Sequence, residues 1–118
     1  MRVNLAAASR DLADEAFHAE VWTNPRQPVP DKRFQFQEAV AYVVDDLDVR
    51  SPQTLIGDVL ANEEEFARFE DLFQALNAML KRIGSTGTYT QASATTEWQQ
   101  VQAAARRLYE GLARSDTP

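Results

Sequence analysis

The chain has 118 residues, of which 44% are hydrophobic and 25% charged, and it contains no cysteine. This length suits one folded domain, and the lack of cysteine excludes disulfides, thiolate nucleophiles and cysteine-ligated metals. The net charge of −6 disfavours binding to nucleic-acid phosphates and to anionic membranes. Because no apolar run reaches transmembrane length and acids interrupt the N-terminal segment, we expect a soluble, cytoplasmic protein without a signal peptide.

The first predicted helix spans residues 4–22. Its apolar face repeats at helical intervals and comprises Leu5, Ala8, Leu12, Ala16 and Ala19. The opposite face is predicted to meet solvent and carries Asp11, Asp14, Glu15 and His18. The helix is expected to end before Asn24–Pro25, because proline cannot continue a helix and restrains the residue before it.

A second helix is predicted to begin at Asp31, which suits an N-cap. Its apolar face comprises Phe36, Ala39, Val40, Val43, Val44 and Leu47. The three valines lower helix propensity, so a strand is the alternative, but the absence of strict alternation favours a helix. Ser51–Pro52 then resembles an N-cap followed by proline at the first helical position, opening a short turn that stops at Gly57.

The third predicted helix has the clearest pattern in the chain. Its apolar face alternates intervals of three and four residues and comprises Phe66, Phe69, Phe73, Leu76, Leu80 and Ile83. Asn62 is expected to cap its start, where the acidic run 63–65 complements the helix dipole. Gly84 is placed for a left-handed C-terminal cap.

The fourth predicted helix begins between Thr88 and Thr95, where Thr88–Gln91 matches a capping box and Ser93 is an alternative cap. Its apolar face comprises Ala94, Trp98, Val101, Ala105, Leu108 and Leu112. It is expected to end near Ala113 and leave residues 113–118 as a frayed tail.

Together the four amphipathic faces predict a single all-α domain over residues 1–118, either a four-helix bundle or a closely related orthogonal helical packing. Its predicted core comprises Phe17, Val40, Val43, Phe69, Phe73, Leu76, Leu80, Trp98, Val101 and Leu108.

His18 is the only histidine, and it offers no complete catalytic or metal-binding set. The spacing Glu15-x-x-His18 occurs in di-iron bundles, but those sites need this motif twice, together with two further glutamates. Ser9 would lie about 13 Å from His18 along one helix, too far for proton transfer. No nucleophile elbow or phosphate-binding loop is present. We therefore expect no enzyme activity, no cofactor and no metal, with His18 on the solvated face.

Negative charge is concentrated in the middle of the chain. Residues 31–71 hold eleven carboxylates against four bases. Asp45, Asp46 and Asp48 lack the glycine and terminal glutamate of a calcium loop, and solvation of a helix end is the simpler interpretation. Trp98 is predicted to be core, whereas Trp22 either plugs the end of the bundle or serves as an interface anchor.

The Val21–Trp22 pair, followed by residues 36–44 leading into Asp45–Asp46, resembles small bacterial all-helical proteins. Some of those proteins are similar to immunity proteins of toxin–immunity pairs. The ten arginines against two lysines, with abundant alanine, are also typical of a GC-rich bacterial genome.

The acidic charge and this resemblance predict a non-enzymatic domain that binds a basic protein, in the manner of an immunity-type inhibitor. The predicted attracting surface comprises Asp45, Asp46, Asp48, Asp58, Glu63, Glu64 and Glu65, with Trp22 as its apolar anchor. The alternative is a self-associating structural or regulatory module whose apolar faces continue across a homodimer interface. Neither nucleic acid nor a membrane is an expected partner.

Overall fold

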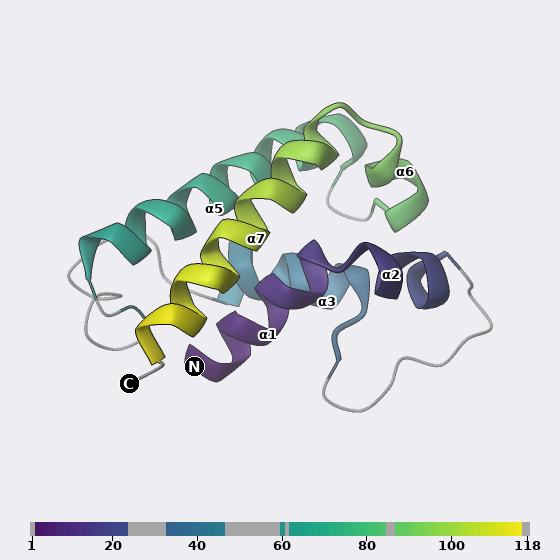
Figure 1. The fold of residues 1–118 in the computed structure, drawn as a ribbon. Coiled ribbons are helices and arrows are strands. Elements are labelled where there is room, and N and C mark those ends of the chain that lie inside the picture. Colours follow the sequence, from purple (N-terminus) through teal and green to yellow (C-terminus); the bar gives the residue numbers. More distant parts are fainter. Residues whose placement is uncertain (1, 24–32, 47–59, 61, 85–86, 117–118) are drawn as a thin grey trace.

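A computed structural model describes residues 2–23, 33–46, 60, 62–84 and 87–116, and every helix or strand assigned within them is a helix (Figure 1). The elements in chain order are α1 (Arg2–Ala13), α2 (Glu15–Phe17), the π-helix η1 (His18–Trp22), α3 (Phe36–Ala41), the π-helix η2 (Tyr42–Asp46), α5 (Glu63–Ile83), α6 (Tyr89–Ser93) and α7 (Glu97–Asp116). The predicted all-α class is confirmed for this described part of the chain.

The two longest helices, α5 and α7, run antiparallel and side by side, and α1 packs against α7 from the other side (Figure 1). Helix α3 packs on α1, and η2 reaches α5. One continuous cluster of buried side chains joins these elements, including Leu5, Leu12, Phe36, Val43, Leu60, Phe69, Leu76, Trp98 and Leu108. The described residues therefore share a single hydrophobic core.

The single helix predicted over residues 4–22 is wrong, because the chain breaks at Asp14. Asp14 has extended backbone angles (φ −89°, ψ 92°), and its side chain accepts a hydrogen bond from the Phe17 backbone N–H as an N-cap. A new helical segment therefore begins with a different phase. Phe17 is buried as predicted, whereas Ala16 and Ala19, expected on the core face, are exposed.

Residues 36–46 are helical, so the strand alternative for the valine-rich segment is wrong. Phe36, Ala39, Val40 and Val43 are buried as predicted, and Val44 is half-buried. Helix α3 begins after Gln35, whose side chain makes no capping hydrogen bond. The predicted cap at Asp31, the apolar position Leu47 and the turn from Ser51–Pro52 to Gly57 lie outside the described residues.

Both ends of α5 lie at the predicted residues, although Gly84 (φ 84°, ψ 162°) does not adopt the left-handed helical conformation expected of its cap. The Asn62 side chain accepts a hydrogen bond from the Glu65 backbone N–H at 2.9 Å. At the other end, Gly84 has a φ of 84°, which glycine adopts without the steric cost of a Cβ. The buried face is rotated from the predicted one, because Leu72 and Met79 are fully buried beside Phe69 and Leu76. The remaining predicted positions, Phe66, Phe73, Leu80 and Ile83, are half-buried.

The predicted fourth helix is divided into α6 and α7. The capping box is real, since the Thr88 hydroxyl accepts from the Gln91 backbone and the Gln91 side chain accepts from the Thr88 backbone. It opens the short α6, however, and the long helix begins only at Glu97, so Ala94 lies between the two helices and is exposed. Residues 113–116 continue α7 rather than fray, because the helix runs to Asp116.

Candidate functional site

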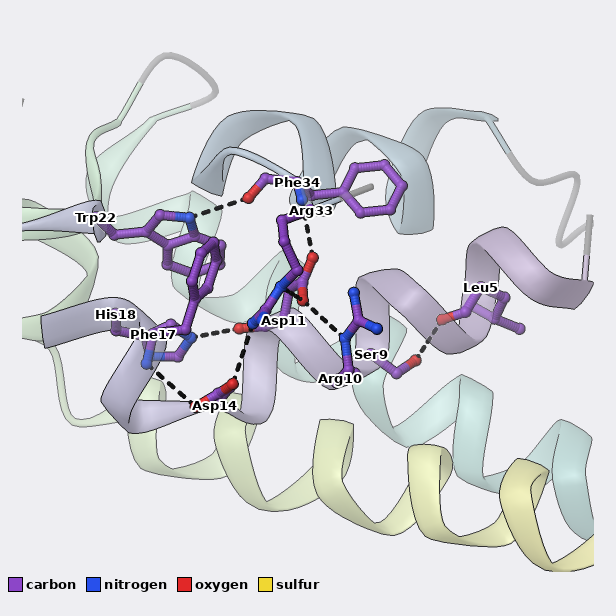
Figure 2. A network of polar contacts seen from close by, with 10 residues as sticks. All are labelled: Leu5, Ser9, Arg10, Asp11, Asp14, Phe17, His18, Trp22, Arg33 and Phe34. Carbon is purple, nitrogen blue, oxygen red and sulfur yellow. Dashed lines mark hydrogen bonds and ion pairs between the residues drawn. The ribbon is translucent and has the colours of Figure 1, made fainter. Parts of the chain in front are cut away.

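A buried ionic cluster joins the end of α1 to the segment that precedes α3 (Figure 2). The Asp11 carboxylate is fully buried, with the Arg33 Nε atom 2.6 Å and the Arg10 Nε atom 3.1 Å from its Oδ1 atom. Its other oxygen, Oδ2, accepts a hydrogen bond from the Phe34 backbone N–H at 2.8 Å. Arg33 also pairs with Asp14 at 3.0 Å, and its guanidinium lies over the Phe17 ring. The Asp11 carboxylate is therefore an acceptor that holds residues 33–34 against the end of α1.

His18 lies beside this cluster with only 1% of its surface exposed, so the predicted solvated histidine is wrong. Its Nε2 atom is hydrogen-bonded to the Asp11 backbone carbonyl, whereas its Nδ1 atom is buried without a partner. Burial lowers the pKa of His18 below its ordinary value of 6.5. The carbonyl of Asp11 and the nearby carboxylates of Asp14, Glu15 and Asp11 oppose this effect only in part.

The surroundings of His18 are aromatic. Its ring contacts the rings of Trp22, Tyr89 and Trp98, which come from η1, α6 and α7. The hydroxyl of Ser9 donates to the Leu5 carbonyl within α1, so it is engaged in the helix backbone. Within the described ranges, no three histidine, aspartate or glutamate side chains are grouped to hold a metal ion. The aromatic contacts of His18 support the packing of η1, α6 and α7.

Trp22 takes the position expected of a plug at the end of the helical core. It is half-buried, and its ring also packs edge-on against Phe17, Phe36 and Tyr89. Its Nε1–H donates to the Phe34 carbonyl at 3.0 Å. The indole therefore contacts η1, α3 and α6 within the chain, and only part of its surface remains available to a partner. Trp98 is buried as predicted.

The structure places only some residues of the predicted acidic surface. Glu63 and Glu64 are exposed at the start of α5, and Glu64 pairs with Arg68 at 2.7 Å. Glu65 is 1% exposed, which corrects its predicted place on that surface; it turns inward because it lies on the same helical face as Phe69 and Leu72. The side chains of Asp45 and Asp46, and the residues Asp48 and Asp58, lie outside the described part.

A second feature of α5, absent from the sequence prediction, combines acids with aromatic rings. Phe66 and Phe73 are half-buried rather than enclosed, and Glu63 and Glu70 are exposed one helical turn from them. We call Glu63, Phe66, Glu70, Phe73 and Gln74 the Glu–Phe face. Between its rings lies a hollow of about 170 Å³, lined by Phe66, Phe69, Glu70, Phe73 and Gln74. The sequence does carry one indication of this face, which is the width of the apolar stripe of α5. When apolar residues cover more of a helix than its neighbours enclose, some of them stay partly exposed.

The Glu–Phe face combines an apolar floor with an acidic rim. Its apolar floor can receive an uncharged side chain, and its rim carries carboxylates that accept hydrogen bonds from cations. Glu70 accepts one hydrogen bond, from the Gln74 amide at 3.1 Å, and Glu63 makes no ion pair within the described residues. Both acids are thus available to a positively charged group.

Comparison with known proteins gives one match. A protein-family model described as a domain of unknown function, DUF7945, matches residues 1–118. No curated protein and no solved structure matches the chain. None of the helices in the described part is both long and apolar enough to cross a membrane.

Proposed function

The chain belongs to the DUF7945 family, and we propose that it acts by binding a basic protein at the Glu–Phe face of α5 rather than by catalysis. The observation that carries this proposal is the placement of half-buried Phe66 and Phe73 beside the exposed acids Glu63 and Glu70. Aromatic rings left partly open to solvent next to charged groups are characteristic of protein interfaces.

The hollow between the rings favours a partner of particular chemistry. An aliphatic or aromatic side chain of the partner enters between Phe66 and Phe73 and leaves water. Lysine or arginine side chains on either side of this anchor approach Glu63 and Glu70. The net charge of −6 adds long-range attraction for a cationic protein, which accelerates encounter at low ionic strength.

A narrower form of the proposal is immunity-type inhibition, in which the domain covers the working surface of a cationic toxin of a bacterial cell. The support for it is the acidic middle of the sequence and the resemblance of residues 21–22 and 36–46 to small bacterial proteins. In this form, Asp45, Asp46, Asp48 and Asp58 extend the attracting surface beyond Glu63 and Glu64.

The test compares two double variants as baits on a column loaded with lysate of the producing cells. Glu63→Lys/Glu70→Lys reverses the rim of the Glu–Phe face, and Glu38→Lys/Glu110→Lys makes the same charge change at exposed positions on α3 and α7. The wild type and the control should retain the same basic protein at low salt, and the first variant should lose it. The association rate of the purified pair should fall steeply as salt rises.

Two results would overturn the proposal. If the wild type retains no basic protein, the proposed partner does not exist. If both double variants retain it equally, the Glu–Phe face is not its binding site. Circular dichroism of each variant establishes that the fold is intact. The self-associating module, the alternative expected from the sequence, has separate support from a second surface of α5.

A further inference from the structure

An open groove lies between α5 and α7, and of the Glu–Phe face only Gln74 also borders it. Its volume is about 440 Å³. Half of the residues that line it are alanines: Ala75, Ala78, Ala103 and Ala104. Such small side chains expose the helix backbones to close approach, so another pair of helices can pack here at short distance.

One end of the groove carries a single charge of each sign on its opposite walls. Arg82 pairs with Glu97 at 2.7 Å near one end of the helix pair, and the Arg68 side chain packs on Gly111 near the other. This antiparallel register places Asp71 of α5 at the level of Arg107 of α7. Both side chains are exposed and line the groove, and neither makes an ion pair within the described residues.

We propose that a second copy of this chain occupies the groove, related by a two-fold axis that runs parallel to α5 and α7. This rotation places α5 of each subunit opposite α7 of the other subunit, while every residue keeps its position along the groove. Asp71 then faces Arg107 of the partner subunit, and Arg107 faces Asp71 of the partner subunit. Both ion pairs lie at one end of the groove, one on each wall, and the alanine side chains of the two subunits meet further along it. The same patch therefore serves both subunits, as an isologous interface requires.

The charge pattern selects a second copy over an unrelated partner. A basic protein would be attracted by Asp71 but repelled by Arg107. An acidic protein would be attracted by Arg107 but repelled by Asp71, so either partner leaves one contact between like charges. Only a surface carrying the same two charges in exchanged positions satisfies both. The inference does not rest on the proposed function, because its argument uses Asp71, Arg107 and the alanines and neither Phe66 nor Phe73, although Gln74 borders both surfaces.

The experiment measures mass by sedimentation equilibrium from micromolar to millimolar protein. The wild type should form a dimer. Asp71→Arg should weaken dimerisation by about tenfold or more, because two guanidiniums then face each other twice, and Arg107→Asp should do the same with carboxylates. The double variant Asp71→Arg/Arg107→Asp should dimerise again, since it restores both pairs with reversed sign.

Two further variants distinguish this groove from other surfaces. Glu38→Lys changes the charge at an exposed position on α3 that does not line the groove, and it should leave dimerisation unchanged. Ala103→Trp fills the floor of the groove and should abolish dimerisation while the thermal unfolding of the monomer is retained. A wild type that is monomeric throughout overturns the proposal, as does a dimer that survives Ala103→Trp or is not restored in the double variant.

Discussion

The imidazole ring of His18 lies parallel to the indole ring of Trp22, with ring centroids 4.3 Å apart and 9° between the ring planes. Stacking places the histidine in an aromatic environment that excludes water, which accounts for the lowered pKa. The Nδ1 atom makes no hydrogen bond to a described residue, so a second proton on the ring would remain buried without a hydrogen-bond partner.

The free energy of unfolding should therefore fall as the pH is lowered from 7 to 5. The unfolded chain takes up a proton at His18 near its ordinary pKa of 6.5, whereas the folded protein takes it up only at a lower pH. The contribution of neutral His18 to the free energy of unfolding is thus fully present above the pKa that His18 has in the unfolded chain. It is lost as the pH falls below that value, by about 1.4 kcal/mol for each unit of difference between the two pKa values. Urea unfolding at several pH values measures this.

The matched control for the histidine is His18→Gln, which cannot titrate. This variant should be less stable than the wild type at pH 7, but its free energy of unfolding should change little between pH 7 and 5. Asp14 does not contribute in this window. Burial opposes ionisation of Asp14, yet the Phe17 N–H and Arg33 lower its pKa below 3.8. A wild type with constant stability from pH 7 to 5 would contradict the assignment.

Asp11→Ala should destabilise the protein by about 3–5 kcal/mol, because it removes one partner of a buried ion pair and leaves the others uncompensated. The change removes the carboxylate beside the Arg33 Nε atom, so that Arg33 keeps its pair with Asp14 alone among the described residues, and it leaves the Phe34 backbone N–H without its acceptor. Arg10→Ala removes a half-exposed member of the same cluster and should cost less than about 1 kcal/mol. Urea unfolding of both variants compares the two costs, and equal losses would argue against Asp11 as the centre of the cluster.

Two glycines should respond in opposite ways to alanine. A Cβ at Gly87 would lie 2.5 Å from the Ile83 Cδ1 atom and 3.0 Å from its Cβ, so Gly87→Ala should cost about 1–3 kcal/mol through overpacking. A Cβ at Gly111 meets the flexible end of Arg68, which can move aside. Gly111→Ala should then be neutral or stabilise the protein by up to about 1 kcal/mol, because alanine favours the interior of α7.

Thermal unfolding of the two glycine variants measures the difference directly. The Arg68–Glu64 pair is one helical turn long and partly exposed, so its loss in Gly111→Ala removes only a few tenths of a kcal/mol. A larger destabilisation by Gly111→Ala than by Gly87→Ala would mean that Arg68 is fixed in its place over α7.

The sequence predicts helices well where their signals are local. Asn62 and Gly84 define the ends of α5 because a cap depends on the residues next to it. The direction in which α5 turns its buried face, by contrast, does not depend on local signals. Phe66 and Phe73 are as apolar as Leu72 and Met79, and only the direction of α7 decides which of them is enclosed. No pattern within the helix contains that direction.

His18 shows how one missed cap changes a prediction of function. If the helical periodicity of α1 is continued past Asp14, His18 falls on the solvent face. In the structure the Asp14 cap starts a new helix, and the His18 ring points inward. The segment Asp14-Glu15-Ala16-Phe17 did contain a capping signal, an aspartate three residues before an apolar side chain. The contact between Asp11 and Arg33 was beyond sequence reasoning, because it depends on how the chain returns from residue 23 to residue 33.

The packing of α1 against α7 has a consequence for biosynthesis. During translation α1 emerges from the ribosome well before α7, the helix with which it shares most of its contacts. The helical hairpin of α5 and α7 brings together residues that are near each other in sequence, whereas Leu5 and Leu12 of α1 stay partly uncovered until α7 has been made. A nascent chain stalled before residue 97 should therefore be a substrate for chaperones, and emergence of α7 should end that association.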